Sequence, residues 1–396
     1  MRFVLLATSI LFIGILSSQT PQDTNVSPVP SPAKAGSRLP FLATLPSGEI
    51  AMSWVEYEEG SPRRFLLATL KGGQWSTPQL ITTGESLMLN WADFPSVSTS
   101  GGLLASHWLE RAKAGEGSYH LKIGLGAFGN EQWKTVYEAP TQTADGYTGF
   151  LSFASFENRL FATFLHNRPS GTRLRVVQLQ ADGQFLKEDV LDDDVCSCCQ
   201  TSTAVTGDGP IVVYRDHEDG QIRDISVIRF EKGTWTKPVP LHRDGWQINA
   251  CPVNGPSIAA RGNFVAVAWF TGAQGKPRVL MATSSDSGRT FSPPVRVDSG
   301  NPIGRVSIAI SDAADKAERF AAVTWLDRLD DQSATVEVRA LRERSGLSKP
   351  ILAGRVSSGR LSGFPRIAIA KSNVLLAWTE DRVKTFQMGV AKLRIP

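Results

Sequence analysis

The chain has 396 residues, of which 20% are charged, and its formal net charge is +4. This charge is small for the size, and no run of lysine and arginine alternates with aromatic residues, so the sequence carries no signature of a nucleic-acid-binding protein. The 10 Trp, 35 Gly and 23 Pro residues, together with the lack of long helical patterns, favour many short strands joined by turns.

The N-terminal segment has the pattern of an export signal. Arg2 precedes an apolar stretch at residues 3–16, and small and polar residues follow it, so residues 1–18 are predicted to be a secretory signal peptide. The alternative, an uncleaved membrane anchor, needs a longer apolar run of about 20 residues. Residues 19–38 are rich in Pro, Ser and Thr and predict a disordered spacer before a single domain at residues 39–396. We therefore expect an exported protein, periplasmic or secreted, with no membrane attachment after cleavage.

From residue 39 onward, one unit recurs at a spacing of about fifty to fifty-eight residues. Each unit contains an apolar strand that ends in an aromatic residue. The seven marker aromatics are Trp54, Trp108, Phe164, Tyr214, Trp269, Trp325 and Trp378. A shorter strand precedes each marker strand, as in Pro95-Ser96-Val97, Pro256-Ser257-Ile258 and Pro365-Arg366-Ile367.

A third strand follows in every unit, and a fourth in all but the last. Four antiparallel strands per unit form the blade of a β-propeller, because stacking blades in a ring buries both faces of each sheet. We predict an all-β propeller of seven four-stranded antiparallel blades. The N-terminal segment after the spacer could supply the missing strand of the last blade, although its prolines make it a poor strand.

One turn has a chemistry of its own. Residues 284–291, Ser-Ser-Asp-Ser-Gly-Arg-Thr-Phe, lie between two strand-like runs and predict a hairpin whose aspartate accepts backbone hydrogen bonds and whose glycine takes a positive φ. The signature positions are Ser284, Asp286, Gly288, Thr290 and Phe291. The segment resembles the Asp-box, or BNR repeat, of sialidases and related β-propellers, in which the motif is structural. Because the sialidase family is six-bladed, six blades are the alternative to seven.

The loops that join second to third strands and the loops that join blades share one face of a propeller. They are longer than the turns of the opposite face and carry carboxylates, arginines, aromatics and all four cysteines. A polar, concave site on the propeller axis is therefore the predicted functional site.

The sialidase resemblance implies a triad of arginines for a carboxylate ligand, an acidic proton donor and a tyrosine–glutamate nucleophile pair. Arg215, Arg223 and Arg305 are the arginines best placed to converge, and Arg366 and Arg382 are weaker candidates. Either Asp216 or Asp93 could be the acid. Either Tyr147 or Tyr214 could be the phenol that pairs with Glu218. The candidate catalytic residues are Arg215, Asp216, Arg223, Arg305 and Tyr147. The candidate ligand-binding residues are Arg215, His217, Arg223, Arg305 and Asp327. The competing interpretation is that Tyr214 is a core residue and that Asp216 and Arg223 form surface ion pairs.

Two cysteines occupy equivalent positions in neighbouring units, since Cys196 and Cys251 both precede their marker aromatic by eighteen residues. The favoured interpretation is a disulfide between them, with Cys198 and Cys199 free or joined to each other. The alternative is a thiolate cluster for a soft metal such as copper(I), with His217 or His242 as a further ligand.

The acidic run at residues 192–194 either binds calcium or is a solvated loop. No other cofactor is expected, and we expect a monomer whose partner is a glycan or another small anionic ligand. The first functional hypothesis is an exported sialidase-like protein that recognises or hydrolyses a glycan, as an exo-sialidase-type glycoside hydrolase. The alternatives are a non-catalytic propeller that binds a ligand or partner, and a thiol-based copper site.

Overall fold

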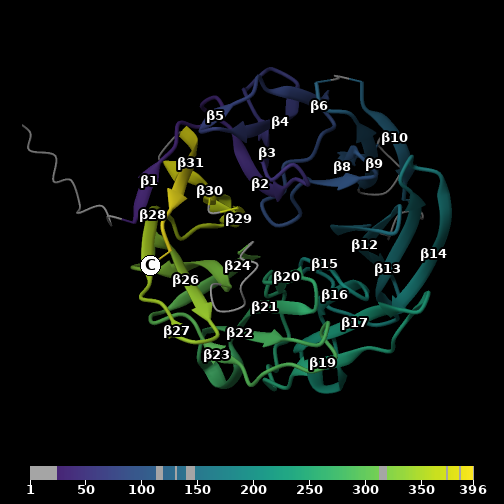
Figure 1. The fold of residues 1–396 in the computed structure, drawn as a ribbon, viewed down its shortest axis with the longest axis vertical. Coiled ribbons are helices and arrows are strands. Elements are labelled where there is room, and N and C mark those ends of the chain that lie inside the picture. The colour runs from purple at the N-terminus through teal and green to yellow at the C-terminus, as the bar shows by residue number, and fades with distance from the viewer. Residues whose placement is uncertain are drawn as a thin grey trace, which may run out of the picture.

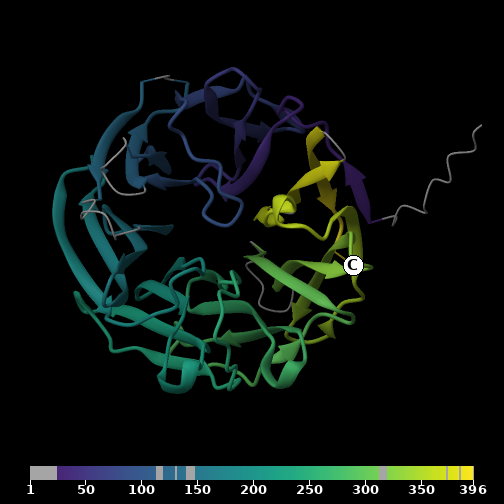
Figure 2. The ribbon, with the colours of Figure 1, turned by 180° about the vertical axis from the view of Figure 1, so that it is seen from behind.

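The computed structural model describes residues 25–112, 119–129, 132–139, 148–311, 319–371, 373–382 and 385–395. The described chain forms seven antiparallel sheets arranged as blades around one axis (Figures 1 and 2). Helical structure in these residues is confined to the 3-10 turns η1 (Asp219–Gln221), η2 (Ala273–Gly275) and η3 (Arg360–Ser362). The prediction of a seven-bladed, all-β propeller is confirmed, and the six-bladed alternative is wrong. In the described part of the chain, no helix is long and apolar enough to span a membrane.

The blades follow one another in chain order, and each begins with its innermost strand. Blade one contains β2 (Arg38–Thr44), β3 (Ile50–Glu56), β4 (Arg63–Lys71), β5 (Gln74–Trp75) and β6 (Gln79–Gly84). Blade two contains β7 (Ser96–Ser100), β8 (Leu103–Arg111), β9 (Tyr119–Gly126) and β10 (Lys134–Glu138). Blade three contains β11 (Thr148–Phe156), β12 (Arg159–Arg168), β13 (Gly171–Gln180) and β14 (Phe185–Asp192). Blade four contains β15 (Ser202–Thr206), β16 (Gly209–Arg215), β17 (Ile225–Glu231), β18 (Thr234–Trp235) and β19 (Val239–His242).

The remaining blades continue the pattern. Blade five contains β20 (Ser257–Arg261), β21 (Phe264–Thr271), β22 (Arg278–Ser284) and β23 (Val295–Arg296). Blade six contains β24 (Pro302–Ile310), β25 (Phe320–Arg328), β26 (Ser333–Arg342), β27 (Gly346–Leu347) and β28 (Ile351–Ser357). Blade seven contains β29 (Arg366–Ala370), β30 (Asn373–Arg382), β31 (Thr385–Leu393) and β1 (Val26–Pro28).

The ring is closed by β1, which pairs antiparallel with β31 as the outer strand of blade seven. This strand lies within residues 19–38, for which the sequence predicts a disordered spacer. For the described part of that segment the prediction is wrong, because the backbone is paired with β31 and the Trp75 indole donates a hydrogen bond to the Pro30 carbonyl at 2.8 Å. An edge strand tolerates Pro28, since its outer side needs no hydrogen-bond donor. The predicted signal peptide lies outside the described residues.

Apolar side chains of adjacent blades share continuous cores. Trp269 of β21 and Trp325 of β25 are among the most deeply buried side chains, and one such core joins Ile211 and Val213 of blade four to Val265 and Trp269 of blade five. Burying a large apolar side chain stabilises the fold by roughly 1.5–3 kcal/mol. The marker aromatics therefore stabilise the contacts between blades.

The turn at residues 284–291 joins β22 to β23 as a hairpin and packs against blade four. The Asp286 carboxylate accepts hydrogen bonds from the backbone N–H groups of Arg289 and Thr290 at 3.0 and 2.9 Å, and from the hydroxyls of Ser284 and Thr290 at 2.7 and 2.6 Å. Burial alone would raise the pKa of Asp286, but these hydrogen bonds outweigh it and hold the pKa well below its ordinary value. Phe291 packs on the core that blades four and five share.

Candidate functional site

A cavity of about 240 Å³ lies where the innermost strands of the blades meet. Its wall contains residues of β2, β7, β11, β15, β20, β24 and β29, so every blade contributes to it. The inter-blade loops add Asp93, Gln200, Gly255 and Phe364. The cavity therefore occupies the axial position that the sequence predicts for the functional site.

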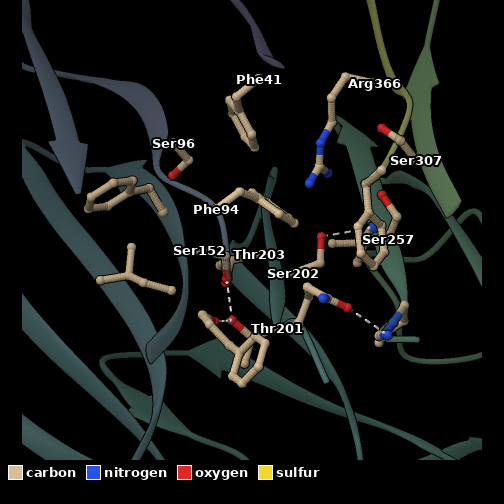
Figure 3. A pocket seen from close by; sticks show the side chains of 18 of the residues that line it. Phe41, Phe94, Ser96, Ser152, Thr201, Ser202, Thr203, Ser257, Ser307 and Arg366 are labelled. Atoms are coloured by element: carbon tan, nitrogen blue, oxygen red, sulfur yellow. Dashed lines mark hydrogen bonds between the residues drawn. The ribbon is translucent and has the colours of Figure 1, made fainter. Parts of the chain in front are cut away.

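The strand register defines one equivalent position in each innermost strand. This residue pairs with the residue that directly precedes the marker aromatic of the second strand. We call these seven residues the axial ring: Phe41, Ser96, Ser152, Ser202, Ser257, Ser307 and Arg366 (Figure 3). Serine is the residue of the repeat, and blades one and seven replace it with Phe41 and Arg366.

The ring serines hold neighbouring blades together. The hydroxyls of Ser202, Ser257 and Ser307 each accept a hydrogen bond from a backbone N–H of the next innermost strand, at 3.1, 3.1 and 3.4 Å. Ser152 lies 2.9 and 2.7 Å from the hydroxyls of Thr201 and Thr203. These contacts make the cavity wall polar and rigid.

Ser96 lies 2.8 Å from Nδ1 of His107. Burial lowers the pKa of His107 to about 3, so this ring is neutral near pH 7. His107 is therefore the hydrogen-bonded core histidine of blade two and carries no charge toward the cavity.

Arg366 places a cation in the cavity. Its guanidinium points inward beside Phe94 (Figure 3), with Cζ 3.8 Å from the centroid of the Phe94 ring and 5.2 Å from that of Phe41. Nε and Nη2 are buried and have no hydrogen-bond partner among the described residues. Burial lowers the pKa of Arg366 to about 9. A buried charge with aromatic faces around it and no anion opposite is costly, and a bound carboxylate would offset that cost.

Asp93 is the one acidic residue among the described residues that line the cavity. Its side chain is 4% exposed, and Oδ1 accepts a hydrogen bond from the backbone N–H of Phe150 at 2.8 Å. The cavity thus combines one guanidinium, one carboxyl group, several hydroxyls and the aromatic rings of Phe41, Phe94 and Phe364.

The arginines that the sequence favours do not line this cavity. The guanidinium of Arg215 donates to the carbonyls of Asn254 at 3.0 and 2.8 Å, of Phe270 at 2.7 Å and of Arg223. Arg223 itself donates to Oε1 of Gln221 at 3.0 Å.

The guanidinium of Arg305 donates to the carbonyls of Gly359 and Gly363 at 2.9 and 3.1 Å, and its Cζ lies 4.8 Å from the centroid of the Trp91 ring. Burial, together with the charges of Arg328 and Arg360, lowers the pKa of Arg305 to about 10. Arg215 and Arg305 are therefore engaged with backbone carbonyls, and the structure does not bring the three predicted arginines together in the cavity. A direct role for them in a site stays a prediction.

Two of the predicted residues, the acid Asp216 and the phenol Tyr214, lie in blade four, outside the cavity wall. Asp216 accepts hydrogen bonds from the Ser226 hydroxyl at 2.7 Å and from the backbone N–H of His217 at 2.8 Å. Burial and the nearby charge of Asp192 raise the pKa of Asp216 to about 6. The Tyr214 hydroxyl donates to Asp192, and burial raises the pKa of Tyr214 above its ordinary value.

The other candidates are distributed over several loops. Nδ1 of His217 lies 3.0 Å from Asp194, and Glu218 pairs with Arg243 at 3.0 Å. Asp327 accepts a hydrogen bond from the backbone N–H of Asn301 at 2.9 Å. Tyr147 and the side chain of Arg382 lie outside the described residues.

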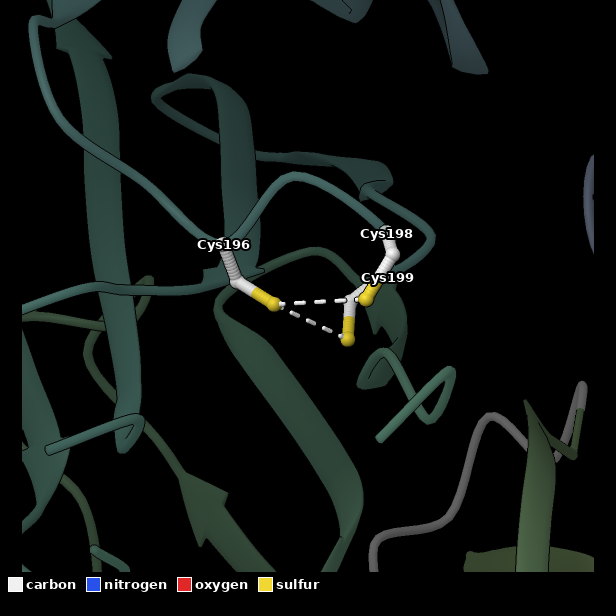
Figure 4. A group of neighbouring side chains, drawn as sticks. All are labelled: Cys196, Cys198 and Cys199. Carbon is white, nitrogen blue, oxygen red and sulfur yellow. Dashed lines mark hydrogen bonds between the residues drawn. The ribbon is translucent and has the colours of Figure 1, made fainter. Parts of the chain in front are cut away.

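The cysteines do not pair as the sequence predicts. Sγ of Cys196 lies 3.3 Å from Sγ of Cys199 and 3.9 Å from Sγ of Cys198 (Figure 4), and all four cysteines are free thiols. The predicted disulfide between Cys196 and Cys251 is wrong, because the loop at 193–201 folds back on itself and turns Cys196 toward its own neighbours. Hydrogen bonding among the three thiols lowers the pKa of Cys196 and raises that of Cys198, while burial raises the pKa of Cys199.

Sequence reasoning gave Arg366 only a secondary place. The signal that identifies it is the exchange of serine for arginine between Pro256-Ser257-Ile258 and Pro365-Arg366-Ile367. When the innermost strands are aligned by their register, Arg366 has a guanidinium at the position where most blades have a serine hydroxyl.

Comparisons with known proteins show the fold. No protein-family model matches the chain, and no curated protein matches it. A polysaccharide lyase, the PL25 ulvan lyase, superposes with a TM-score of 0.58 at 13% identity over 90% of this chain and 94% of that chain. The same kind of lyase bound to -[GlcA(1-4)Rha3S]- superposes with a TM-score of 0.56 at 13% identity, covering 93% of this chain and 94% of that chain.

The GH93 α-L-arabinofuranosidase of Fusarium graminearum superposes with a TM-score of 0.50 at 10% identity over 94% of this chain and 95% of that chain. The NanB sialidase of Streptococcus pneumoniae reaches a TM-score of 0.44, which is too low to carry an argument. The chain therefore shares its propeller fold with glycan-active enzymes, and these identities are too low to transfer an activity.

Proposed function

We propose that this chain recognises a glycan through a carboxylate-bearing sugar, which the axial cavity holds by its carboxylate on Arg366. The observation that carries the proposal is the Arg366 guanidinium, which points into the cavity with Nε and Nη2 buried and without a hydrogen-bond partner in the described part of the chain. Planar guanidinium groups bind carboxylates with two parallel hydrogen bonds. An acidic sugar is thus the ligand whose charge complements the site.

The size and the wall of the cavity support a single sugar unit. Its volume of about 240 Å³ lies below the range of about 300–1,000 Å³ that is typical of pockets for larger ligands. Hydroxyls of Ser98, Ser152 and Thr203 line one part of the wall, and the ring of Phe94 lines another. Hydroxyls suit the polar edges of a sugar and aromatic rings suit its apolar face, so the terminal residue of a chain is the expected ligand.

The lyase complex among the structural neighbours supports an acidic ligand, because the saccharide named in its description contains GlcA. In the finer form of the proposal, the chain is a sialidase-type hydrolase that removes a terminal acidic sugar. Asp93, the carboxyl group of the cavity wall, would then be the proton donor.

A glycan array that presents matched acidic and neutral glycans tests recognition. We expect binding to glycans that end in a uronic or sialic acid and none to their neutral counterparts. A fluorogenic sialoside then tests hydrolysis. If the wild type turns it over and Asp93→Asn does not, the result supports a hydrolase. If the wild type binds acidic glycans without turnover, the result supports recognition only. Equal binding to acidic and neutral glycans would contradict the proposal.

A further inference from the structure

The loop at residues 193–201, which joins blade three to blade four, brings three thiols together outside the axial cavity. The sulfur atoms of Cys196, Cys198 and Cys199 all lie within 4.8 Å of one another (Figure 4). The sulfurs of Cys196 and Cys199 are 3.3 Å apart, well beyond the roughly 2.05 Å of a disulfide bond. With metal–sulfur bonds of about 2.3 Å, an ion at the centre of three sulfurs holds them about 4 Å apart. The separations of 3.3 and 3.9 Å are close to that arrangement.

The loop is held in place by contacts on both sides of the cluster. The backbone N–H of Cys196 donates to the Arg215 carbonyl at 3.1 Å. The Gln200 side chain donates to the Ala92 carbonyl at 2.7 Å and accepts from the backbone N–H of Gly255 at 3.0 Å. Cys196 and Cys199 are 1% and 2% exposed, whereas Cys198 is partly exposed. The site is thus preformed, and Cys198 provides its access to solvent.

Arg215, whose carbonyl accepts the hydrogen bond from the Cys196 backbone, is a buried cation beside the cluster. The Arg215 side chain is 1% exposed, and its hydrogen bonds go to backbone carbonyls, with no carboxylate partner among the described residues. A buried cation needs a nearby negative charge, and Cu(I) with three thiolates has a net negative charge.

We propose that Cys196, Cys198 and Cys199 bind one Cu(I) ion as three thiolates, with Arg215 offsetting part of the excess negative charge. Binding forms three copper–sulfur bonds, breaks three S–H bonds and releases three protons to solvent, with no change in oxidation state. Thiolates select soft cations such as Cu(I), whereas structural zinc takes four ligands. His217 and His242 do not complete the set, because no histidine nitrogen of the described residues lies in the group that the three sulfurs form. The proposal does not depend on the proposed function, because none of the three cysteines lines the cavity.

The test is an anaerobic titration of the reduced full chain with Cu(I) in competition with a chromophoric Cu(I) chelator. We expect one Cu(I) per chain, and X-ray absorption of the loaded protein should show three sulfur neighbours at about 2.3 Å. Cys198→Ser should weaken binding by more than about 100-fold, beyond the usual effect of an outer-shell change. Cys251→Ser is the matched control, because Cys251 is exposed and outside the cluster, and it should bind like the wild type.

Three results would overturn the proposal. In the first, the reduced wild-type chain takes up no copper. In the second, the site prefers Zn(II), and the absorption spectrum shows a fourth ligand. In the third, Cys198→Ser binds Cu(I) with the same affinity as the wild type. Circular dichroism of each variant establishes that it is folded, and the absorption measurement on the wild type needs no variant. A Cys196–Cys199 disulfide in the isolated protein, together with no copper binding after its reduction, would make the loop a redox pair instead.

Discussion

Replacing Arg366 separates acidic-sugar recognition from folding. In Arg366→Met the aliphatic part of the side chain keeps a similar volume among Phe41, Phe94 and Phe364, and the charge is lost. Removing one partner of a buried, hydrogen-bonded charge pair costs about 2–5 kcal/mol, which corresponds to a roughly 30-fold to several-thousand-fold weaker Kd. We expect the affinity for methyl glucuronide or N-acetylneuraminic acid, measured by isothermal titration calorimetry, to fall by at least about 30-fold.

The matched comparisons identify the cause. Arg366→Lys keeps the charge but loses the planar pair of donors, so we expect an affinity between those of the wild type and Arg366→Met. The melting temperature of Arg366→Met should equal or exceed that of the wild type, because an unpaired buried cation has been removed. Unchanged affinity in Arg366→Met would refute the reasoning. Equal losses for methyl glucuronide and methyl glucoside would refute it as well, since the charge would then play no part.

Further predictions concern stability. Asp286→Ala should lower the melting temperature by several degrees. Because hydrogen bonds depress the pKa of Asp286, this difference from the wild type should shrink as pH falls below about 4. A difference that stays constant with pH would contradict the prediction. The pKa of Asp216 is raised to about 6, so the stability that its protonated form provides is complete below about pH 4 and is lost as pH rises through 6. In thermal melts, the melting temperature of Asp216→Asn relative to the wild type should therefore rise across this range. A difference that does not change with pH would contradict the raised pKa. In Gly255→Ala the new Cβ would lie 2.1 Å from the backbone oxygen of Gln200, so calorimetry should show destabilisation of about 1–3 kcal/mol. Gly84→Ala, whose nearest neighbour atom is 3.6 Å away, is its control and should change little.

Most of the fold can be predicted from the sequence because the repeat is carried by local patterns. The marker aromatics lie in β3, β8, β12, β16, β21, β25 and β30, the second strand of each blade. Period-two alternation and turn residues identify such strands without knowledge of the tertiary structure. The closing strand β1 carries no such pattern, since it has three residues and contains Pro28. Its pairing depends on β31 at the far end of the chain, which no local signal reveals.

The site is less predictable for a different reason. The partners of Arg215 and Arg305 are backbone carbonyls of other segments, and every residue type offers a carbonyl, so sequence cannot distinguish such an arginine from one that binds a ligand. Cys196 and Cys251 have the same spacing from their marker aromatics, but the conformation of the loop decides which sulfurs meet. Arg366 could have been singled out, because its departure from the serine of the repeat is visible once the innermost strands are aligned.

A crystal structure of the protein with N-acetylneuraminic acid or methyl glucuronide would show directly whether Arg366 holds the carboxylate of an acidic sugar. We expect the ligand in the axial cavity, with its carboxylate oxygens within hydrogen-bond distance of the Arg366 guanidinium and its hydroxyls facing Ser152 and Thr203. A ligand bound elsewhere on the propeller, or a cavity ligand whose carboxylate points away from Arg366, would contradict it.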